Sequence, residues 1–394
     1  MGNREYYCSQ KFRFIKIDLE SNTMYTCDAA KPHSIDLQWL EKNPGQLFNN
    51  EININERLMM LQNQRNNSCE QNCWPAEDRG TLSPRLLRGG NVKTHTEIYT
   101  QPEILDLTIN GNCNLTCSYC CKEYSSAWRQ DIINNGNYKI TQADSRYQAE
   151  TKDYVLNKLS QSTIKRSKHY QLLLNEIRLM SPGLKTLYVT GGEPLLDNQL
   201  IDILIDLPLD PLVEFKLFTG LGMSMSRFKL LLGKLETINK KYVNFQLKIS
   251  AESTDKFFEF NRYGNKWNEF LEKIELLKTQ NINFIFHSTL SNLTLFKFVE
   301  FYKIFEKYTF TFDVANQPTM LAPHILDIDS KQMIQQSLTE LSPDLAMSVL
   351  QMMQATPTEM EKKNLKEFLT EFVSRRPDLD LKIFPTTFLT WLEL

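Results

Sequence analysis

The chain has 394 residues, which is enough for two or three domains at roughly 150 residues per domain. Its mixture of 41% hydrophobic and 23% charged residues is typical of globular proteins and excludes a fibrous fold or long disorder. The formal net charge of −2 excludes a global cationic field, so nucleic acid is not a favoured partner. No apolar run is long enough to predict a membrane partner or span.

Residues 1–90 form the first predicted unit. The chain starts without the apolar core of a secretory signal, and a cytoplasmic protein is therefore expected. Residues 12–18 alternate between apolar and polar side chains and predict a strand, with residues 24–27 as its hairpin partner. A short helix is expected over residues 55–62. A loop rich in Gly, Ser and Arg, ending near residue 91, marks the predicted boundary.

Cysteine is confined to the first third of the chain. A long chain without an export signal is not the usual disulfide scaffold, and clustered cysteines there indicate metal binding or chemistry. The eight cysteines are Cys8, Cys27, Cys69, Cys73, Cys113, Cys117, Cys120 and Cys121.

From about residue 100 short apolar runs recur, each followed by a helical stretch. This alternation is typical of βαβ units with a parallel sheet. Six such runs fit either a doubly wound sheet or a partial (β/α)6 TIM-like barrel, and both place functional loops at the C-terminal ends of the strands. The expected strands are residues 104–109, 185–190, 213–218, 245–250, 283–288 and 309–313.

The remaining stretches are predicted to be mostly helical, except for a polar loop over residues 130–145. A helical C-terminal extension is expected over residues 321–394, where apolar residues recur at helical spacing. The expected helices of the barrel region are residues 147–159, 170–180, 267–280 and 295–308, and the apolar stripe of the extension is Leu365, Phe368, Leu369 and Phe372.

Three cysteines, Cys113, Cys117 and Cys120, follow the first of these strands with the spacing C-x3-C-x2-C. A loop at the end of a strand can bring three such thiolates together. A structural zinc site normally takes four protein ligands, and a fully protein-bound four-iron cluster takes four thiolates. Three thiolates would therefore leave one iron open for another ligand. A structural zinc site or buried free thiols are the alternatives, and Cys121 stays without an assigned role.

With Tyr119 at its aromatic position, this segment resembles the signature of the radical S-adenosylmethionine (SAM) superfamily, C-x3-C-x-aromatic-C. The resemblance implies a 4Fe–4S cluster held by Cys113, Cys117 and Cys120, whose open iron chelates the amine and carboxylate of SAM. It also implies an external electron donor such as flavodoxin or ferredoxin. Reductive cleavage of SAM would then give a 5′-deoxyadenosyl radical that abstracts hydrogen from a substrate.

A second motif, Gly191-Gly192-Glu193-Pro194, follows the second predicted strand. Two glycines allow a backbone to approach a ligand closely, and the carboxylate of Glu193 is a suitable acceptor for an ammonium group. The motif is similar to the GGEP motif of the same superfamily, which contacts the methionyl amine of SAM. The order of the two motifs along the chain also matches that superfamily.

Two further residues match positions near the methionyl carboxylate and ribose in this family. Ser250 ends the fourth predicted strand, and Arg262 follows shortly after it. The fork of an arginine fits a carboxylate with two hydrogen bonds, although Arg262 could equally be a surface residue that caps a helix. Asp313 and Asn316 end the sixth strand and either touch substrate or cap the backbone, whereas His287 is expected in the core.

The four cysteines that precede the triad are enough to close a second metal site. Cys8 and Cys27 flank the predicted hairpin, and Cys69 and Cys73 follow the predicted helix. This layout resembles the SPASM and Twitch modules, which carry auxiliary iron–sulfur clusters. Zinc or no metal at all are the alternatives.

The sequence is therefore interpreted as a radical SAM enzyme with three regions. They are an auxiliary-cluster domain (1–90), a partial barrel (100–320) and a helical extension (321–394). A peptide or protein substrate is favoured because relatives with SPASM or Twitch modules often act on peptides. Radical modification of a small metabolite, sugar, nucleotide or nucleic acid is the alternative. A second alternative is a non-enzymatic protein that binds zinc or a cluster and responds to the redox state.

Overall fold

A computed structural model describes residues 5–140, 168–315 and 317–394. Within these residues one large sheet has nine strands, and a second, small sheet pairs β5 (Thr116–Cys117) with β9 (Arg262–Tyr263). In sheet order, the large sheet consists of β11 (Phe310–Val314), β10 (Phe284–Leu290), β8 (Asn244–Ser250), β7 (Glu214–Thr219), β6 (Thr186–Thr190), β4 (Ile104–Thr108), β1 (Phe14–Asp18), β2 (Thr23–Tyr25) and β3 (His33–Ser34).

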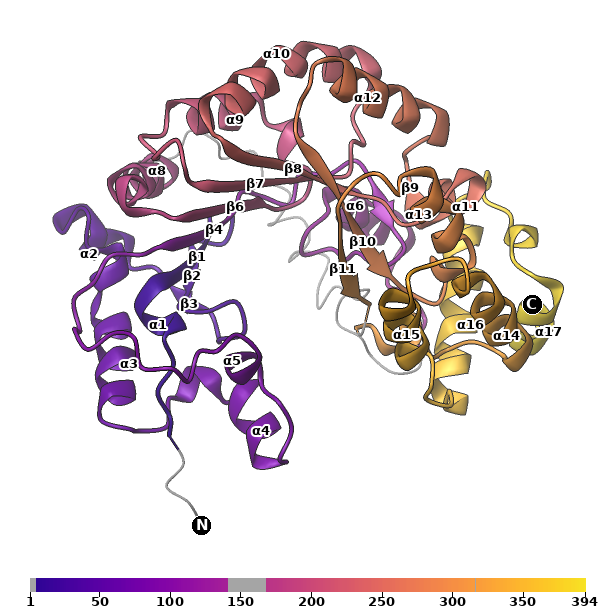
Figure 1. Cartoon of the computed structure of the whole chain (residues 1–394), viewed down its shortest axis with the longest axis horizontal. Coiled ribbons are helices and arrows are strands. Elements are labelled where there is room, and N and C mark those ends of the chain that lie inside the picture. Colours follow the sequence, from indigo (N-terminus) through magenta and orange to yellow (C-terminus); the bar gives the residue numbers. More distant parts are fainter. Residues whose placement is uncertain (1–4, 141–167, 316) are drawn as a thin grey trace.

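The six strands expected from the apolar runs are all present as β4, β6, β7, β8, β10 and β11. They pair in parallel and lie in the order of the sequence, without the reversal of order that defines a doubly wound sheet. The parallel α/β sheet predicted from the sequence is thus confirmed. In Figure 1 this sheet curves, and helices cover its convex side.

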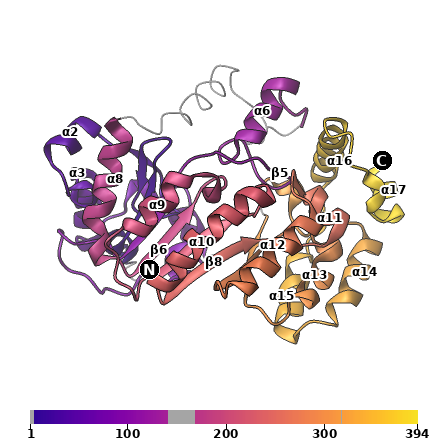
Figure 2. The ribbon, with the colours of Figure 1, turned by 90° about the horizontal axis from the view of Figure 1, so that it is seen from above.

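The helices of the convex side pack against the strands through a shared apolar core. Figure 2 shows them lying in front of the strands when the molecule is seen from above. These helices are α8 (Lys168–Met180), α9 (Asn198–Asp206), α10 (Met225–Lys241), α12 (Trp267–Thr279) and α13 (Phe298–Ile304). The helices expected at 170–180, 267–280 and 295–308 correspond to α8, α12 and α13, and the one expected at 147–159 lies outside the described residues.

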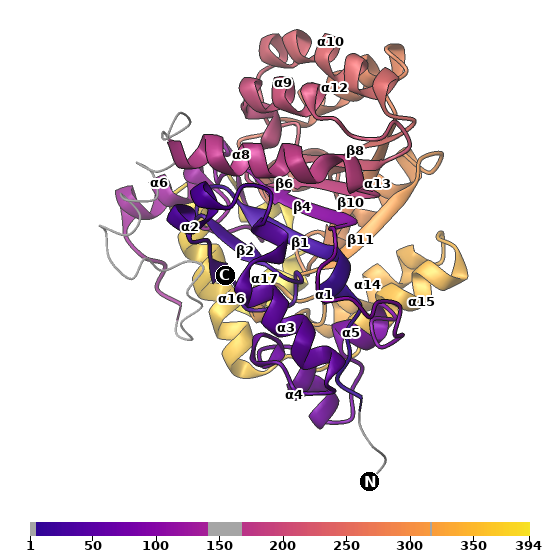
Figure 3. The same cartoon turned by 90° about the vertical axis from the view of Figure 1, so that its left-hand side faces the viewer.

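The N-terminal region contributes strands to the same sheet. The predicted hairpin is present as β1 and β2, and β1 pairs in parallel with β4 over five residues, from Phe14 opposite Ile104 to Asp18 opposite Thr108. The sheet therefore runs across the boundary expected near residue 91. The helices of this region are α1 (Gln10–Arg13), α2 (Leu37–Lys42), α3 (Glu51–Leu61), α4 (Cys73–Asp78) and α5 (Pro84–Leu87). Figure 3 shows α3, α4 and α5 below the sheet and α2 beside it.

The C-terminal region is helical, as the sequence predicts. The apolar stripe that begins at Leu365 is completely buried in a second core, which also holds Trp128 and Tyr138. Figure 1 shows these helices at the opposite end of the curved sheet from α4. They are α14 (Ile328–Leu338), α15 (Pro343–Met352), α16 (Glu359–Ser374) and α17 (Thr386–Leu392), with α11 (Asp255–Asn261) next to them.

One predicted loop is wrong in its first part. Residues 130–145 were expected to be irregular, but α6 spans Ser126–Asn135. Ser125 caps this helix by accepting from the Trp128 amide, and the Trp128 ring is fully buried. The stretch was predicted to be a loop because its composition is polar. The helix is stabilised by the Ser125 cap and by the buried Trp128 ring. Among the helices that the structure describes, none has the length and apolarity to span a bilayer.

Candidate active site

A cavity of about 800 Å3 opens at the C-terminal ends of the parallel strands. Thr190, Thr219, Ser250 and Thr289, at or next to the last residues of four strands, line it. All residues that the sequence assigns to the cluster and to SAM meet here. They are Cys113, Cys117, Tyr119, Cys120, Gly191, Gly192, Glu193, Pro194, Ser250 and Arg262.

The cysteine loop is held on both sides of the triad. Cys117 lies in β5 opposite Arg262 of β9, so the short ribbon brings the thiol and the guanidinium together. The Ser126 hydroxyl accepts from the Cys113 amide at 3.1 Å, and the Trp128 indole donates to the carbonyl of Cys117 at 3.0 Å. The same α6 that the sequence did not predict therefore anchors the loop.

The triad thiols are enclosed but reach the cavity. Cys117 is buried, whereas Cys113 and Cys120 are partly exposed. Burial raises the pKa of the Cys117 thiol to about 11, although the neighbouring Arg262 guanidinium lowers it. Cys121 also lines the cavity, next to Cys120. No three His, Cys, Asp or Glu side chains among the described residues are arranged to hold a single metal ion. A four-iron cluster has a different requirement, because each thiolate binds a different iron.

The two glycines of the GGEP loop serve a close contact between backbones. The Gly192 amide donates to the Asn110 carbonyl and the Glu193 amide to the Asn112 carbonyl, each at 2.8 Å. A Cβ on Gly192 would lie 2.6 Å from the Asn112 carbonyl oxygen, and Gly191 has φ of 135°, which favours glycine. The sequence suggested an approach to a ligand, but here the glycines let this loop pack on the cysteine loop.

Glu193 is almost completely buried, with 2% of its surface exposed. Its carboxylate accepts from the Thr219 hydroxyl at 2.7 Å, from the Gly220 amide at 2.8 Å and from the Leu195 amide at 3.2 Å. It therefore ties the GGEP loop to the end of β7. Burial raises the pKa of Glu193 above its ordinary value despite these donors. A nearby ammonium group would favour the charged carboxylate, so the site suits an amine.

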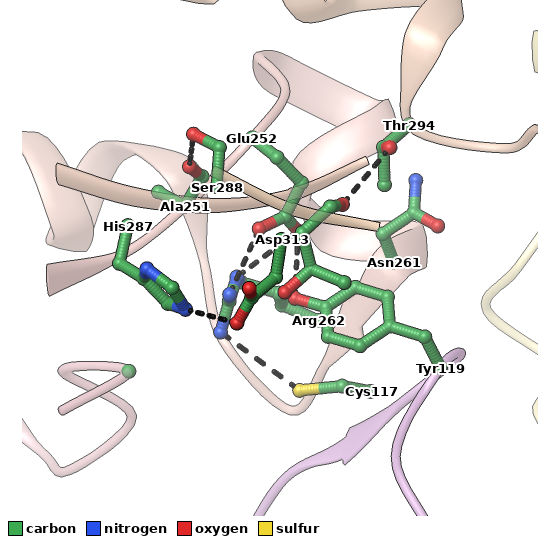
Figure 4. A network of polar contacts seen from close by, with 12 residues as sticks. Cys117, Tyr119, Ala251, Glu252, Asn261, Arg262, His287, Ser288, Thr294 and Asp313 are labelled. Carbon is green, nitrogen blue, oxygen red and sulfur yellow. Dashed lines mark hydrogen bonds and ion pairs between the residues drawn. The ribbon is translucent and has the colours of Figure 1, made fainter. Parts of the chain in front are cut away.

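Arg262 is already engaged by a carboxylate of the chain. Its Nε and Nη2 donate to the two oxygens of Glu252 at 3.1 and 2.8 Å, and the Tyr119 hydroxyl donates to the same carboxylate at 2.9 Å. Figure 4 shows this network, with Arg262 Nη1 directed at Cys117 Sγ, 4.0 Å away. The two-bond fork predicted for SAM is thus used by Glu252.

Sequence reasoning did not single out Glu252. The signal was available, because Glu252 stands two residues after Ser250 at the end of a predicted strand, where functional loops lie in parallel sheets. The side chain is completely buried, and a buried carboxylate needs a partner. The partner is Arg262, ten residues later in the chain.

A second polar pair lines the same cavity. His287, expected in the core, is partly exposed and lines the cavity together with Asp313. Its Nε2 lies 3.2 Å from the Asp313 carboxylate, and its Nδ1 lies 2.9 Å from the Thr311 hydroxyl. The His287 hydrogen bond lowers the pKa of Asp313. Asp313 therefore presents a carboxylate to the cavity, whereas Asn316 lies outside the described residues.

The four N-terminal cysteines also converge. Cys8, Cys27, Cys69 and Cys73 are all buried and line one cavity of about 10 Å3. They come from the ends of short elements: Cys8 precedes α1, Cys27 follows β2, and Cys73 begins α4. Burial raises the pKa of Cys27 to about 12 and that of Cys69 to about 11. The Cys27 and Cys69 thiols therefore stay protonated at neutral pH unless a cation or a metal stabilises the thiolate.

Cations surround this second set of thiols. Lys11, Arg85 and Arg88 line the same small cavity, and Arg88 Nη1 lies 3.8 Å from Cys27 Sγ. Lys11 is completely buried and pairs with Glu56 at 2.7 Å. Arg85 and Arg88 are also paired with carboxylates, Glu77 and Asp28, and cations close to thiols favour the thiolate form.

The fold is that of an α/β protein with a thiol-lined cavity at the C-terminal ends of its parallel strands. A family model described as Radical SAM superfamily matches residues 107–304, which are about half of the chain and include both motifs. The chain belongs to the radical SAM superfamily. It is therefore an enzyme, and the family implies SAM and a 4Fe–4S cluster as its cofactors.

Solved structures with similar parts include native anSMEcpe with bound AdoMet, which is 18% identical, covers 60% of this chain and has a TM-score of 0.35. This chain spans only 59% of that one. Streptococcus suis SuiB bound to precursor peptide SuiA is 12% identical, with 95% of this chain and 71% of that chain covered and a TM-score of 0.32. No curated protein matches the chain.

Proposed function

We propose that Cys113, Cys117 and Cys120 hold the 4Fe–4S cluster and that the cavity beside them binds SAM. The observation that carries this proposal is that both motifs line one cavity of about 800 Å3. When bound and reduced, the cluster supplies the electron that splits SAM into methionine and a 5′-deoxyadenosyl radical. The region 100–320 then acts as a partial (β/α)6 barrel that carries the site at its strand ends.

Each side chain around the cavity would contact a different part of SAM. The buried carboxylate of Glu193 would pair with the methionyl amine of SAM. Arg262 offers its remaining Nη1, because Glu252 occupies the other two donors. Ser250 supplies a hydroxyl from the end of β8, and Tyr119, Gly191, Gly192 and Pro194 complete the wall.

We also propose that residues 1–90 hold an auxiliary iron–sulfur cluster on Cys8, Cys27, Cys69 and Cys73. Their shared cavity and the surrounding cations support it. Zinc is the alternative, because four thiolates are also a common structural zinc site.

The substrate is proposed to be a peptide or protein that enters beside Asp313 and His287. The Asp313 side chain is 72% exposed, so it can accept hydrogen bonds from substrate N–H groups. Phe312, next to Asp313 in β11, packs against the apolar core of the helical extension 321–394. Electrons are proposed to come from a cytoplasmic flavodoxin or ferredoxin.

The cluster assignment is tested by comparing two neighbouring cysteines. The wild type, Cys120→Ala and Cys121→Ala are reconstituted anaerobically with iron and sulfide. Two four-iron clusters give about eight irons per chain. We expect Cys120→Ala to lose about half of this iron and to form no 5′-deoxyadenosine with SAM and dithionite, whereas Cys121→Ala matches the wild type. Undiminished cleavage by Cys120→Ala would overturn the assignment.

The substrate proposal has a separate test. The genes beside this one are searched for short peptides, each peptide found is co-expressed with the protein, and its mass is measured by mass spectrometry. The expected result is a change in peptide mass with the wild type that is absent with Cys120→Ala. An unmodified peptide together with active SAM cleavage would contradict the peptide proposal while leaving the cofactor site intact.

A further inference from the structure

The carboxylate of Glu252 lies behind the active-site wall. It follows the end of β8 and has no exposed surface. It is not among the residues that line the cavity, whereas its partners Arg262 and Tyr119 are. Glu252 therefore acts on the site through these two side chains and not through contact with a ligand.

One carboxylate organises two residues beside the cysteine triad. Arg262 is fixed by two hydrogen bonds and Tyr119 by one. The guanidinium also stacks over the Tyr119 ring, with 5.7 Å between Cζ and the ring centroid. Tyr119 stands between Cys117 and Cys120, and Arg262 pairs with Cys117 across the β5–β9 ribbon. Figure 4 shows Glu252, Arg262, Tyr119 and Cys117 as one chain of contacts.

We propose that Glu252 is a positioning residue that fixes Arg262 and Tyr119 against the cysteine loop and neutralises the arginine charge beside the cluster. This inference rests on the proposed function, because it assumes that Cys117 is a cluster ligand. Glu252 lies outside both family motifs. It would orient Tyr119, which belongs to the cysteine motif, and Arg262, which belongs to neither motif.

The charge argument follows from burial. Arg262 is 3% exposed, so water does not screen its charge, and the nearest thiol is 4.0 Å from Nη1. Glu252 compensates that charge within hydrogen-bond distance. Without Glu252 an unpaired cation would face the thiolate, and a cation next to a cluster favours addition of an electron. The cluster would then be a weaker reductant, and SAM cleavage needs a strong one.

The geometric argument gives a second consequence. A guanidinium held by two bonds to Glu252 keeps only Nη1 for the cavity. If Glu252 no longer accepts both bonds, the Arg262 fork is free to turn toward the thiolate or toward the carboxylate of SAM. A change in the KM for SAM is therefore expected together with the change in potential.

The experiment compares Glu252→Gln with the double variant Glu252→Gln/Arg262→Gln. Glutamine keeps the size of the side chain and removes its charge. The potential is measured by EPR-monitored redox titration of the cluster whose signal changes when SAM is added, which separates it from an N-terminal cluster. As a control, Glu300→Gln removes a carboxylate that bonds Thr254 nearby but contacts neither Arg262 nor Tyr119.

We expect Glu252→Gln to shift the reduction equilibrium at least tenfold toward the reduced cluster, which is 59 mV for one electron. The double variant should return toward the wild-type potential because both charges are gone, and Glu300→Gln should not shift it. An unchanged potential in Glu252→Gln would overturn this inference alone. If Glu252→Gln binds too little iron to titrate, a double variant that fails to restore iron binding overturns it. A wild type without a SAM-responsive cluster overturns the proposed function as well.

Discussion

Substitution of Gly192 should disturb the cysteine loop more directly than any other change in the GGEP motif. A Cβ there would lie 2.6 Å from the carbonyl oxygen of Asn112 and 2.9 Å from the carbonyl carbon of Gly111. Both are backbone atoms, so no flexible side chain can move aside. The loops are joined by two backbone hydrogen bonds, from Gly192 to Asn110 and from Glu193 to Asn112. Gly192→Ala must therefore push the loops apart and stretch these bonds.

The expected cost combines two effects. Overpacking of this kind costs about 1–3 kcal/mol, and each weakened hydrogen bond contributes about 1 kcal/mol. We expect Gly192→Ala to lower the free energy of unfolding of the metal-free protein by about 3–5 kcal/mol, measured by urea denaturation. Because Asn112 directly precedes Cys113, the variant should also bind less iron after reconstitution.

Gly233 provides the matched control. It lies within α10, and a Cβ there would meet no atom within 4 Å. Gly233→Ala should raise stability by up to about 1 kcal/mol, because alanine is the better helix former, and should leave iron binding unchanged. A Gly192→Ala protein that unfolds at the wild-type urea concentration with full iron content would refute the close-packing argument.

Three further changes test the fold around the two cysteine sets. Arg129→Ala should lower stability by about 3–5 kcal/mol in urea denaturation, since it leaves the buried carboxylate of Glu20 without its partner at 2.6 Å; equal stability of both proteins would contradict this. Burial raises the pKa of Glu56, but Lys11 and His33 outweigh it and hold the pKa well below its usual range. The stability from this carboxylate is therefore present above its unfolded pKa of about 4.3 and is lost as the pH falls toward the folded pKa. In thermal unfolding from about pH 3 to 7, the loss of stability at acid pH should be smaller in Glu56→Gln than in the wild type. An equal loss in both proteins would count against the ion pair. Thr358→Ala removes the capping box of α16 and should cost about 0.5–2 kcal/mol without altering iron content, which a urea midpoint and an iron assay check together.

The sequence predicted the parallel strands well because their signal is local. A buried strand such as β7 carries its apolar pattern within six residues. Helix α6 was missed for the opposite reason. Its residues are mostly polar, and its stability comes from the Ser125 cap and from Trp128 buried in the C-terminal core. That core forms only when the distant α16 packs against it.

The residues of the candidate site that belong to short sequence motifs could be predicted. The triad and the GGEP loop stand after successive strands, and parallel strands bring their ends to one edge of the sheet. The contacts between the motifs were not predictable. Glu252 with Tyr119, and Glu20 with Arg129, join residues more than 100 positions apart. Such pairs depend on the register of strands and loops, which local patterns do not specify.

Because of Glu20, we do not expect the N-terminal region to behave as a detachable module. It follows β1, and its carboxylate accepts from the Gly111 amide at 2.9 Å while it pairs with Arg129 at 2.6 Å. The end of β1 thus supports the start of the cysteine loop, and β1 itself covers the edge of β4. Removal of residues 1–90 would expose β4 as an edge strand and leave the buried Arg129 cation without its carboxylate partner. The two sets of cysteines are therefore linked through one pair of strands, so the geometry of the triad depends on the region that carries the other four.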